Sequence, residues 1–275
     1  GALGTMAVGE GGPELVKQLL RQTYDVKRPP VIAVYLKGKL RKGVGPQDVA
    51  LALVKATFAR GFVKNKILEF IGPGIANLSM DYRIGIDVMT TETTCLSSIW
   101  ETDEKTQEFF RVHGREGDYK KLTVSQPAYY DGAVVIDLSR VEPMIALPFH
   151  PSNAYTIREF LERPVELLKI AEEQGRKLKG DDSFTLTDKV KDGKVYVDQG
   201  VIAGCAGGGY ENVAEAAEIL RGKSVGTGEF ALSVYPASQP VYKALTEGGY
   251  VGTLMEAGAV VKTAFCGPCF GAGDV

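Results

Sequence analysis

The sequence of 275 residues lacks a long hydrophobic run: no apolar stretch approaches the roughly 20 residues needed to cross a bilayer. A secretory signal is also missing, because residues 1–6 have neither a basic start nor a long apolar segment. No basic stripe is visible along the chain, whose formal net charge is −2. These absences argue against a membrane protein, a secreted protein and a nucleic-acid-binding protein.

Cysteine is scarce as well. Four cysteines in a chain of this length, without an export signal, argue against a disulfide framework and indicate reduced thiols in the cytoplasm. Hydrophobic residues make up 44% and charged residues 24%, which is typical of a globular protein long enough for two domains. The first residue is not methionine and the chain ends abruptly at residues 273–275. We therefore expect a fragment whose partners include missing domains of the same protein.

Apolar runs between turn residues predict α/β structure in the first half of the chain. Pro29 and Pro30 end any preceding helix and lead into an apolar run at residues 31–36, which predicts a buried strand. A helix that starts at proline and stops at glycine is expected over residues 46–60, and a strand at residues 66–71.

The middle of the chain is less regular. Residues 81–100 predict a long helix despite many threonines, and residues 101–115 predict a polar one. The composition changes near residues 126–127, and an apolar strand is expected at residues 133–138. The predicted division is a tail of a missing N-terminal domain at 1–27, a first α/β domain at 28–126 and a second α/β domain at 127–275.

From residue 201 onward, predicted strands and helices alternate. This alternation implies a parallel sheet with right-handed crossovers, so the predicted fold class is α/β. The strands are expected at 201–203, 230–235 and 260–265, and the helices at 211–221 and 239–248.

Three of the four cysteines come directly after predicted strands. Cys205 follows the first of the alternating strands, and Cys266 and Cys269 follow the last one. Ligands gather at the carboxyl ends of parallel strands, so the two loops could face one crevice, where three thiolates would converge. Neighbouring glycines and the positive end of the helix near Glu211 favour the thiolate, the form that binds metal.

Other uses of these thiols stay open. A complete structural zinc site needs four ligands, and the fourth is not evident, since neither His113 nor His150 lies at finger spacing. The C-x-x-C pair alone is spaced like the redox pair of thioredoxin-like proteins, in which case Cys205 would be a small core residue. Cys95, among threonines of a predicted helix, is expected to be a buried structural residue.

The segments around these cysteines resemble the two cluster-ligand motifs of the aconitase and isopropylmalate dehydratase family. The first is Ile-Ala-Gly-Cys at 202–205 with Tyr-Glu-Asn at 210–212, and the second is Ala-Phe-Cys-Gly-Pro-Cys-Phe-Gly at 264–271. Residues 70–74, 130–138 and the glycine-rich stretch 1–12 are also similar to the family, so the resemblance covers nearly the whole chain. It is closest to an aconitase-like branch of hydratases.

The resemblance implies the iron-sulfur core of a hydro-lyase, built as two three-layer αβα domains. It implies a [4Fe-4S] cluster held by Cys205, Cys266 and Cys269, with the fourth iron free to bind a substrate hydroxyl and carboxylate. Glu92 aligns with an active-site glutamate of the family, and a solvated helical glutamate is the alternative. The implied reaction is the reversible addition or removal of water on a small hydroxy polycarboxylic acid.

The chain departs from the family at several positions. Val88 stands where the family has asparagine, and Ala206 and Gly207 replace a threonine and an asparagine, so we expect a substrate other than citrate. The family's histidine-bearing loops, substrate-binding arginines and C-terminal swivelling domain have no counterpart here, so the fragment alone should be inactive. The alternatives are a non-catalytic iron-sensing or interaction protein, and a thiol–disulfide protein.

Overall fold

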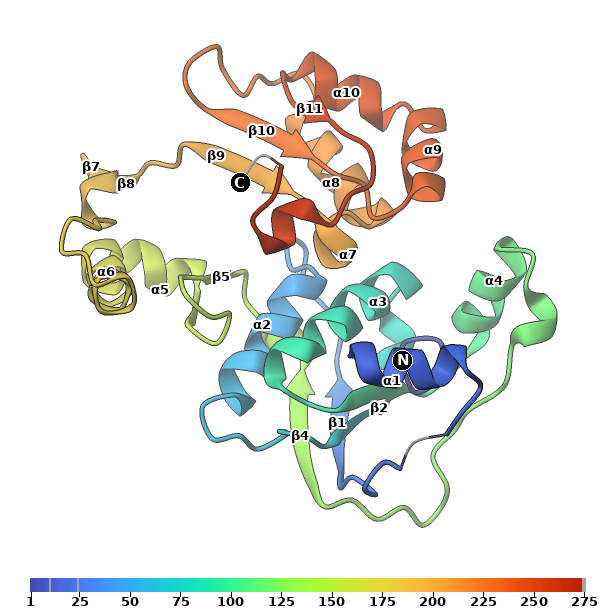
Figure 1. The fold of residues 1–275 in the computed structure, drawn as a ribbon. Coiled ribbons are helices and arrows are strands. Elements are labelled where there is room, and N and C mark those ends of the chain that lie inside the picture. The colour runs from blue at the N-terminus through green and yellow to red at the C-terminus, as the bar shows by residue number, and fades with distance from the viewer. Residues whose placement is uncertain (10, 24, 274–275) are drawn as a thin grey trace. The chain divides into compact units, whose positions relative to one another are not determined.

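The computed structural model describes residues 1–9, 11–23 and 25–273, which form two compact units (Figure 1). The first unit comprises Gly1–Val44 and Val49–Val141, and the second comprises Gly45–Asp48 and Glu142–Val275. Positions 10 and 24 of the predicted tail, and 274 and 275 of the predicted second domain, lie outside the described residues. No described helix is both long and apolar enough to span a bilayer.

The first unit is built on a four-stranded parallel sheet in the order β3-β2-β1-β4. The crossovers β1–α2–β2 and β2–α3–β3 both advance the sheet in the same direction, so α2 and α3 cover the same face. In chain order the elements are α1 (Gly12–Leu19), β1 (Val31–Lys37), α2 (Pro46–Thr57), β2 (Ile67–Ile71), η1 (Ile75–Asn77), α3 (Met80–Val88), η2 (Met89–Thr93), β3 (Ser97–Trp100), α4 (Glu104–Val112), η3 (Glu116–Asp118), β4 (Gly132–Asp137) and η4 (Leu138–Arg140), where η denotes a 3-10 helix.

The core of the first unit lies between the sheet and its helices. Ile32, Val34 and Leu36 are fully buried on one face of β1, because residues two apart in a strand point the same way. They pack in one cluster with Val49 and Leu53, which lie four residues apart on α2. The predicted strand at 31–36 and the predicted helix from 46 are confirmed by this arrangement.

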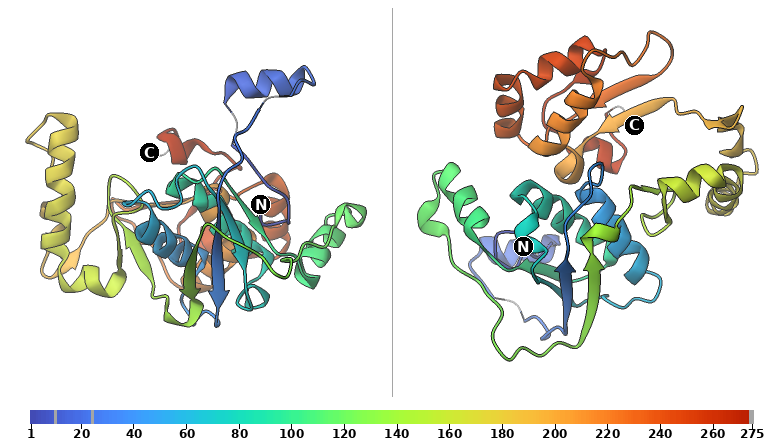
Figure 2. Two further views of the ribbon diagram at one scale, coloured as in Figure 1. Left: turned by 90° about the horizontal axis from the view of Figure 1, so that it is seen from below. Right: turned by 180° about the vertical axis from the view of Figure 1, so that it is seen from behind.

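The helix α1 is the exception to this packing. Pro13 lies at an early helical position, as the sequence predicts, but α1 has no buried residue. Figure 2 shows it standing clear of the sheet of its own unit.

The prediction of a single helix over residues 81–100 is wrong for the second half of that range. The helix α3 ends at Val88, and the following turn closes with Thr94 in the left-handed region, at φ 62°. Ser97–Trp100 then form β3, and the Trp100 ring stacks on that of Phe70 in β2 at 4.0 Å between centroids. Threonines have low helix propensity, and the partner strand that stabilises β3 is distant in sequence.

The predicted domain boundary at residues 126–127 differs from the division of the structure into units, which falls between Val141 and Glu142. The strand β4 was expected to open the second domain, but it pairs with β1 from Ile32↔Gly132 to Lys37↔Asp137. The Asp131 carboxylate accepts a hydrogen bond from the Val31 amide at 2.8 Å, which ties the starts of the two strands together. Residues up to 141 therefore belong to the first unit, since strand order depends on pairing across about 100 residues.

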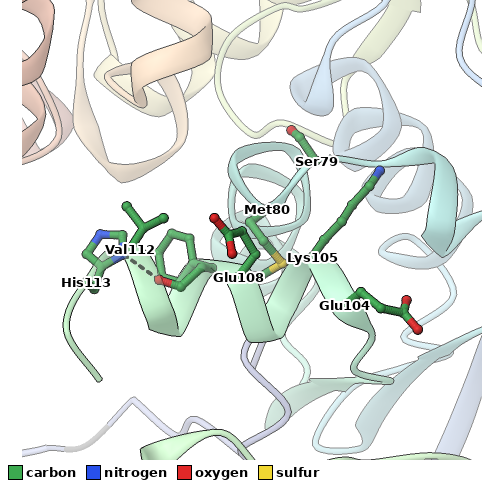
Figure 3. A pocket seen from close by; sticks show the side chains of 8 residues that line it. Ser79, Met80, Glu104, Lys105, Glu108, Val112 and His113 are labelled. Carbon is green, nitrogen blue, oxygen red and sulfur yellow. Dashed lines mark hydrogen bonds between the residues drawn. The ribbon is translucent and has the colours of Figure 1, made fainter. Parts of the chain in front are cut away.

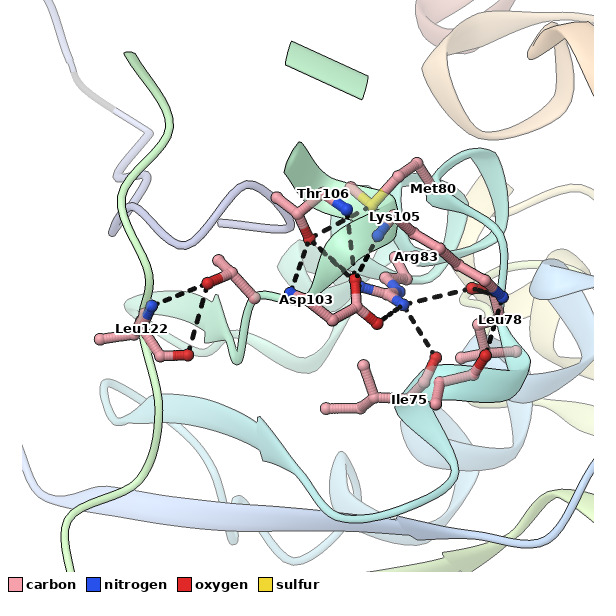
Figure 4. Close-up of polar contacts among 10 residues, drawn as sticks. Ile75, Leu78, Met80, Arg83, Asp103, Lys105, Thr106 and Leu122 are labelled. Carbon is pink, nitrogen blue, oxygen red and sulfur yellow. Dashed lines mark hydrogen bonds and ion pairs between the residues drawn. The ribbon is translucent and has the colours of Figure 1, made fainter. Parts of the chain in front are cut away.

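A buried arginine links the loops that follow β2 and β3 (Figure 4). Arg83 is 0% exposed and donates to both carboxylate oxygens of Asp103, and to the carbonyls of Ile75 and Leu78. Partial burial would raise the pKa of Asp103, but the hydrogen bonds and charge of Arg83, aided by Thr106, hold it below its ordinary value. This network fixes η1 and the start of α4 to α3.

The second unit is also α/β, with a three-stranded parallel sheet in the order β11-β10-β9. The α/β fold class is thus confirmed in both units. In chain order the elements are β5 (Met144–Ala146), β6 (Ala154–Thr156), α5 (Ile157–Glu162), α6 (Pro164–Lys179), η5 (Thr187–Lys189), β7 (Val190–Lys191), β8 (Lys194–Val195), β9 (Gln199–Ile202), α7 (Gly204–Gly207), α8 (Tyr210–Leu220), β10 (Ala231–Val234), α9 (Gln239–Glu247), α10 (Tyr250–Glu256), β11 (Val260–Val261) and η6 (Gly267–Phe270).

The predicted strand–helix alternation after residue 200 is confirmed. Val234 in the central strand is fully buried against Val213 of α8, Leu245 of α9 and Leu254 of α10. The hairpins β5–β6 and β7–β8 were not predicted, because strands of two or three residues are too short to show a period.

A buried carboxylate holds the segment after α6 in place. Glu172 has a side chain that is 7% exposed, and it accepts hydrogen bonds from the Leu186 and Thr187 amides at 2.9 and 3.1 Å. The Glu172 carboxylate also accepts a hydrogen bond from the Thr187 hydroxyl and forms an ion pair with Arg176. These backbone hydrogen bonds, more than the nearby guanidinium, lower the pKa of Glu172 to about 2 from its ordinary value of 4.5.

This carboxylate makes the second unit sensitive to acid. A lowered pKa stabilises the folded state above the ordinary value of 4.5, and that stabilisation is lost as the pH falls from 4.5 towards 2. Glu172→Gln is therefore expected to unfold at lower urea concentration than the parent chain at pH 7, with a difference that shrinks towards pH 3. The neighbouring exposed Glu173, changed to glutamine, is the matched control and should leave the pH profile unchanged. A constant difference across the pH range would contradict the prediction.

Candidate metal centre

Cys205 lies where the strand β9 ends and a short helix begins. Ala203 is still extended, Gly204 has φ +77°, and Cys205 is an exposed residue of α7. The Asn212 side chain amide donates to the Ala206 carbonyl at 2.8 Å, which ties α7 to the following helix α8. Asn212 thus positions the loop that carries the first cysteine.

Cys266 and Cys269 lie in the loop that follows β11, the strand at the other side of the same sheet. Cys266 is the residue before η6, and the Cys269 amide donates to its carbonyl at 3.1 Å. Both thiols are exposed. Because β9, β10 and β11 are parallel, the loops after β9 and β11 leave the sheet at the same edge.

The two loops approach each other closely at that edge (Figure 1). A Cβ atom added to Gly204 would lie 2.8 Å from the Cys269 sulfur, so this sulfur sits against the backbone that precedes Cys205. Partial burial raises the pKa of the Cys269 thiol, and the nearby Cys266 and Cys205 sulfurs raise it further. The structure therefore brings together the three cysteines that the sequence singles out.

For Cys269, burial and the neighbouring sulfurs oppose the thiolate that the surrounding glycines were expected to favour. Its raised pKa has a clear cause, since burial and two neighbouring sulfurs both oppose a further negative charge. Bound iron would remove that opposition, because a coordinating thiol is deprotonated by the metal's charge.

The three thiols are exposed soft donors, the kind of ligand that an iron-sulfur cluster takes. Among the described residues, no group of three histidine, cysteine, aspartate or glutamate side chains that could hold a single metal ion is found. The backbone cradle at Gly204 and the three soft sulfur donors match the chemistry of an iron-sulfur cluster.

Two aromatic residues that the sequence analysis did not single out flank the C-x-x-C loop. The rings of Phe265 and Phe270 meet edge to face at 6.2 Å between centroids and are 49% and 68% exposed. The Phe265 ring lies so close to the Gly267 backbone that no side chain fits there. An aromatic residue directly before and after Cys266-Gly-Pro-Cys269 is the signal that could have found them.

A substitution at Gly204 tests whether the close approach of the Cys269 sulfur to this backbone is needed for iron binding. Gly204→Ala would strain a backbone with φ +77° and push the Cys269 sulfur from its place, so reconstituted iron should fall by about tenfold. Gly207→Ala is the matched control, because it lies on the same short helix with open space around its Cα. Iron and sulfide analysis, with circular dichroism to verify folding, measures both variants. Equal iron content in the two variants would contradict a role for the Gly204 backbone in positioning the Cys269 sulfur.

The remaining predicted site residue, Glu92, lies apart from this loop pair in the chain, as do Cys95 and the two histidines, for which no site role was predicted. Glu92 is a half-buried residue of η2 in the first unit, so its predicted role near the cluster stays a prediction. Cys95, also in the first unit, is half-buried and its thiol donates to the Thr90 carbonyl at 3.3 Å, which agrees with a structural role. His113 and His150 make local contacts, to Phe109 and Ser152 respectively.

A hollow of about 430 Å³ in the first unit contains none of the predicted site residues. It lies between the start of α3 and the helix α4, and its lining is mostly apolar (Figure 3). Lys105 at its edge donates to the carbonyls of Ala76 and Leu78, and a ring nitrogen of His113 is 2.7 Å from the Phe109 carbonyl. Because none of the predicted site residues lines it, this hollow is not taken as the candidate site.

The fold and these loops define an α/β protein that presents three thiols at one edge of a parallel sheet. The chain belongs to the aconitase family (aconitate hydratase), whose model matches residues 1–275. The family predicted from the cysteine motifs is thereby confirmed.

Two relatives illustrate the similarity. The chain is 32% identical over 271 residues to the 2,3-dimethylmalate dehydratase large subunit of Eubacterium barkeri. It is 33% identical over 272 residues to the 3-isopropylmalate dehydratase large subunit of Moorella thermoacetica. Each alignment covers 98% of this chain and 56% of the relative, so the chain spans about half the length of the curated relatives it matches.

Proposed function

We propose that this chain is the cluster-binding part of a hydro-lyase that reversibly removes water from a small hydroxy polycarboxylic acid. The observation that carries the proposal is the meeting of the Cys205 and Cys269 loops at one sheet edge, with Cys266 beside them. Cys205, Cys266 and Cys269 would hold a [4Fe-4S] cluster. Such a cluster supplies Lewis-acid chemistry at the iron that no cysteine ligates.

The protein's own residues hold and surround that centre. Gly204 allows the close approach of the Cys269 sulfur, Asn212 positions the Cys205 loop, and the Phe265–Phe270 pair flanks the other loop. Glu92 is proposed as the active-site carboxylate, on the strength of its place in the family alignment.

The proposed substrates are hydroxy dicarboxylic acids of the malate type. The relatives are named as dehydratases of 3-isopropylmalate and 2,3-dimethylmalate, and both are large subunits. Val88, Ala206 and Gly207 replace polar residues expected near the site, which supports a less polar substrate than citrate. The partner would be the remaining domains of the whole protein or a separate small subunit.

The test is an activity assay of the whole protein with its partner subunit after anaerobic reconstitution of the cluster. Turnover of 3-isopropylmalate or 2,3-dimethylmalate, followed by the ultraviolet absorbance of the unsaturated product, is expected to exceed turnover of citrate. Preference for citrate would contradict the substrate class. An intact cluster with no turnover of any hydroxy acid would favour the non-catalytic, iron-sensing alternative.

A further inference from the structure

Four cations line a hollow of about 500 Å³ in the first unit, near the start of its sheet. Lys27 and Arg28 come from the segment before β1, and Lys64 and Lys66 from the segment before β2. No carboxylate is found among the described residues that line this basic hollow. Within the described part of the chain, none of the four cations forms an ion pair.

The backbone holds the two cationic segments side by side. The Ile67 amide donates to the Pro30 carbonyl at 3.0 Å, and the Leu96 amide donates to the Lys66 carbonyl at 2.8 Å. The Lys66 ammonium lies 5.1 Å from the centre of the Phe62 ring, and its side chain is half-buried. The two cationic segments are therefore already held together in the free protein, which lowers the entropy cost of binding an anion between them.

An apolar hollow of the same size adjoins the basic one. Met6, Val8 and Ile67 line it, and Val26, Pro29 and Leu96 line both hollows. Its acidic residue, Glu14, belongs to the apolar hollow alone and so disfavours an anion there.

We infer that the joined hollows bind a small organic phosphate, whose phosphate or diphosphate group lies among the four cations and whose aliphatic part lies in the apolar hollow. Arginine and lysine are the side chains that bind phosphate oxygens, through a planar fork and a point charge respectively. A volume of about 500 Å³ for each hollow lies within the range of small-molecule sites. Among the described residues that line the two hollows none is aromatic, so no ring there can stack on a base, which favours a hydrocarbon chain over a nucleotide.

The test measures binding of two probes to the full chain by isothermal titration calorimetry at low salt. Inorganic pyrophosphate reports the cationic half alone, and geranyl diphosphate reports both halves. Geranyl diphosphate is expected to bind at least about tenfold more tightly, because each buried methylene adds to the affinity. Equal affinities for the two probes would overturn the assignment of the apolar hollow.

Variants identify the residues involved. Lys64→Gln/Lys66→Gln should weaken both probes by about tenfold or more, since each removes a charge-assisted hydrogen bond. Lys120→Gln/Lys121→Gln removes the same charge from exposed residues that line neither hollow, and should leave both affinities unchanged. Val26→Ser should weaken geranyl diphosphate only, and Val26 is 58% exposed, so the fold is not at risk.

Two outcomes would reject the proposal. Equal losses in the two lysine pairs would show a general effect of net charge. A single-stranded oligonucleotide that binds more tightly than geranyl diphosphate, with the same dependence on Lys64 and Lys66, would show a nucleic-acid surface instead.

Discussion

Replacing Cys205 by serine is expected to abolish the visible absorbance that the chain gains on anaerobic reconstitution with iron and sulfide. Serine keeps the size of the residue but removes the soft thiolate that iron-sulfur chemistry requires. Because the Cys205 loop meets Cys269 at one sheet edge, the two remaining sulfurs would hold only part of the cluster. The fall in bound iron should exceed about tenfold, the scale of losses seen when even outer-shell partners are removed.

Cys95→Ser is the matched control for this experiment. Cys95 lies in the first unit and its thiol donates to the Thr90 carbonyl, a contact that a serine hydroxyl can replace. Iron and sulfide content should stay at the parent level. Full iron content in Cys205→Ser would falsify the three-thiolate site. A parent chain that binds no iron but cycles between a thiol pair and a Cys266–Cys269 disulfide would favour the thiol–disulfide alternative.

The second large effect concerns the stability of the first unit. Arg83→Met is expected to lower the free energy of unfolding of that unit by about 3 kcal/mol. The change leaves the Asp103 carboxylate without its cation and removes one donor each from the carbonyls of Ile75 and Leu78. The Leu78 amide and the Lys105 ammonium remain as donors to these two carbonyls. The Asp103 side chain is 21% exposed, so water recovers part of the loss and the value lies at the lower end for a broken buried ion pair.

The measurement can use the chain's single tryptophan. Trp100 is 0% exposed and stacks on Phe70 in the first unit, so its fluorescence during urea unfolding reports on that unit. Arg111→Met is the control, because Arg111 pairs with Glu108 on an exposed helix face and should show no measurable change. An unchanged urea midpoint in Arg83→Met would show that the network in Figure 4 makes no net contribution to the stability of the first unit.

Much of the local structure was predictable from the sequence. Buried Ile32, Val34 and Leu36 alternate along β1, and Pro46 starts α2, as the residue pattern indicates. The strand β3 was missed because its stability comes from pairing and from the Phe70–Trp100 stack. A window of sequence that contains one strand does not contain its partner.

Part of the candidate site could be predicted from the sequence, and part could not. The C-x-x-C spacing and the position of Cys205 after a strand were visible in the sequence. The closeness of Gly204 to the Cys269 sulfur was not, because these residues are brought together by the register of three strands. The role of Asn212 and the aromatic pair around the second loop likewise required the folded chain.

Residue type, short-range period and spacing were enough to predict the α/β class, the family and three candidate thiols. Only the folded chain shows that β4 belongs to the first unit and that Arg83 joins two loops. It also shows that four cations from separate segments share one hollow. The physical reason is that strand pairing, burial and charge clustering join residues tens of positions apart, whereas sequence patterns record only near neighbours.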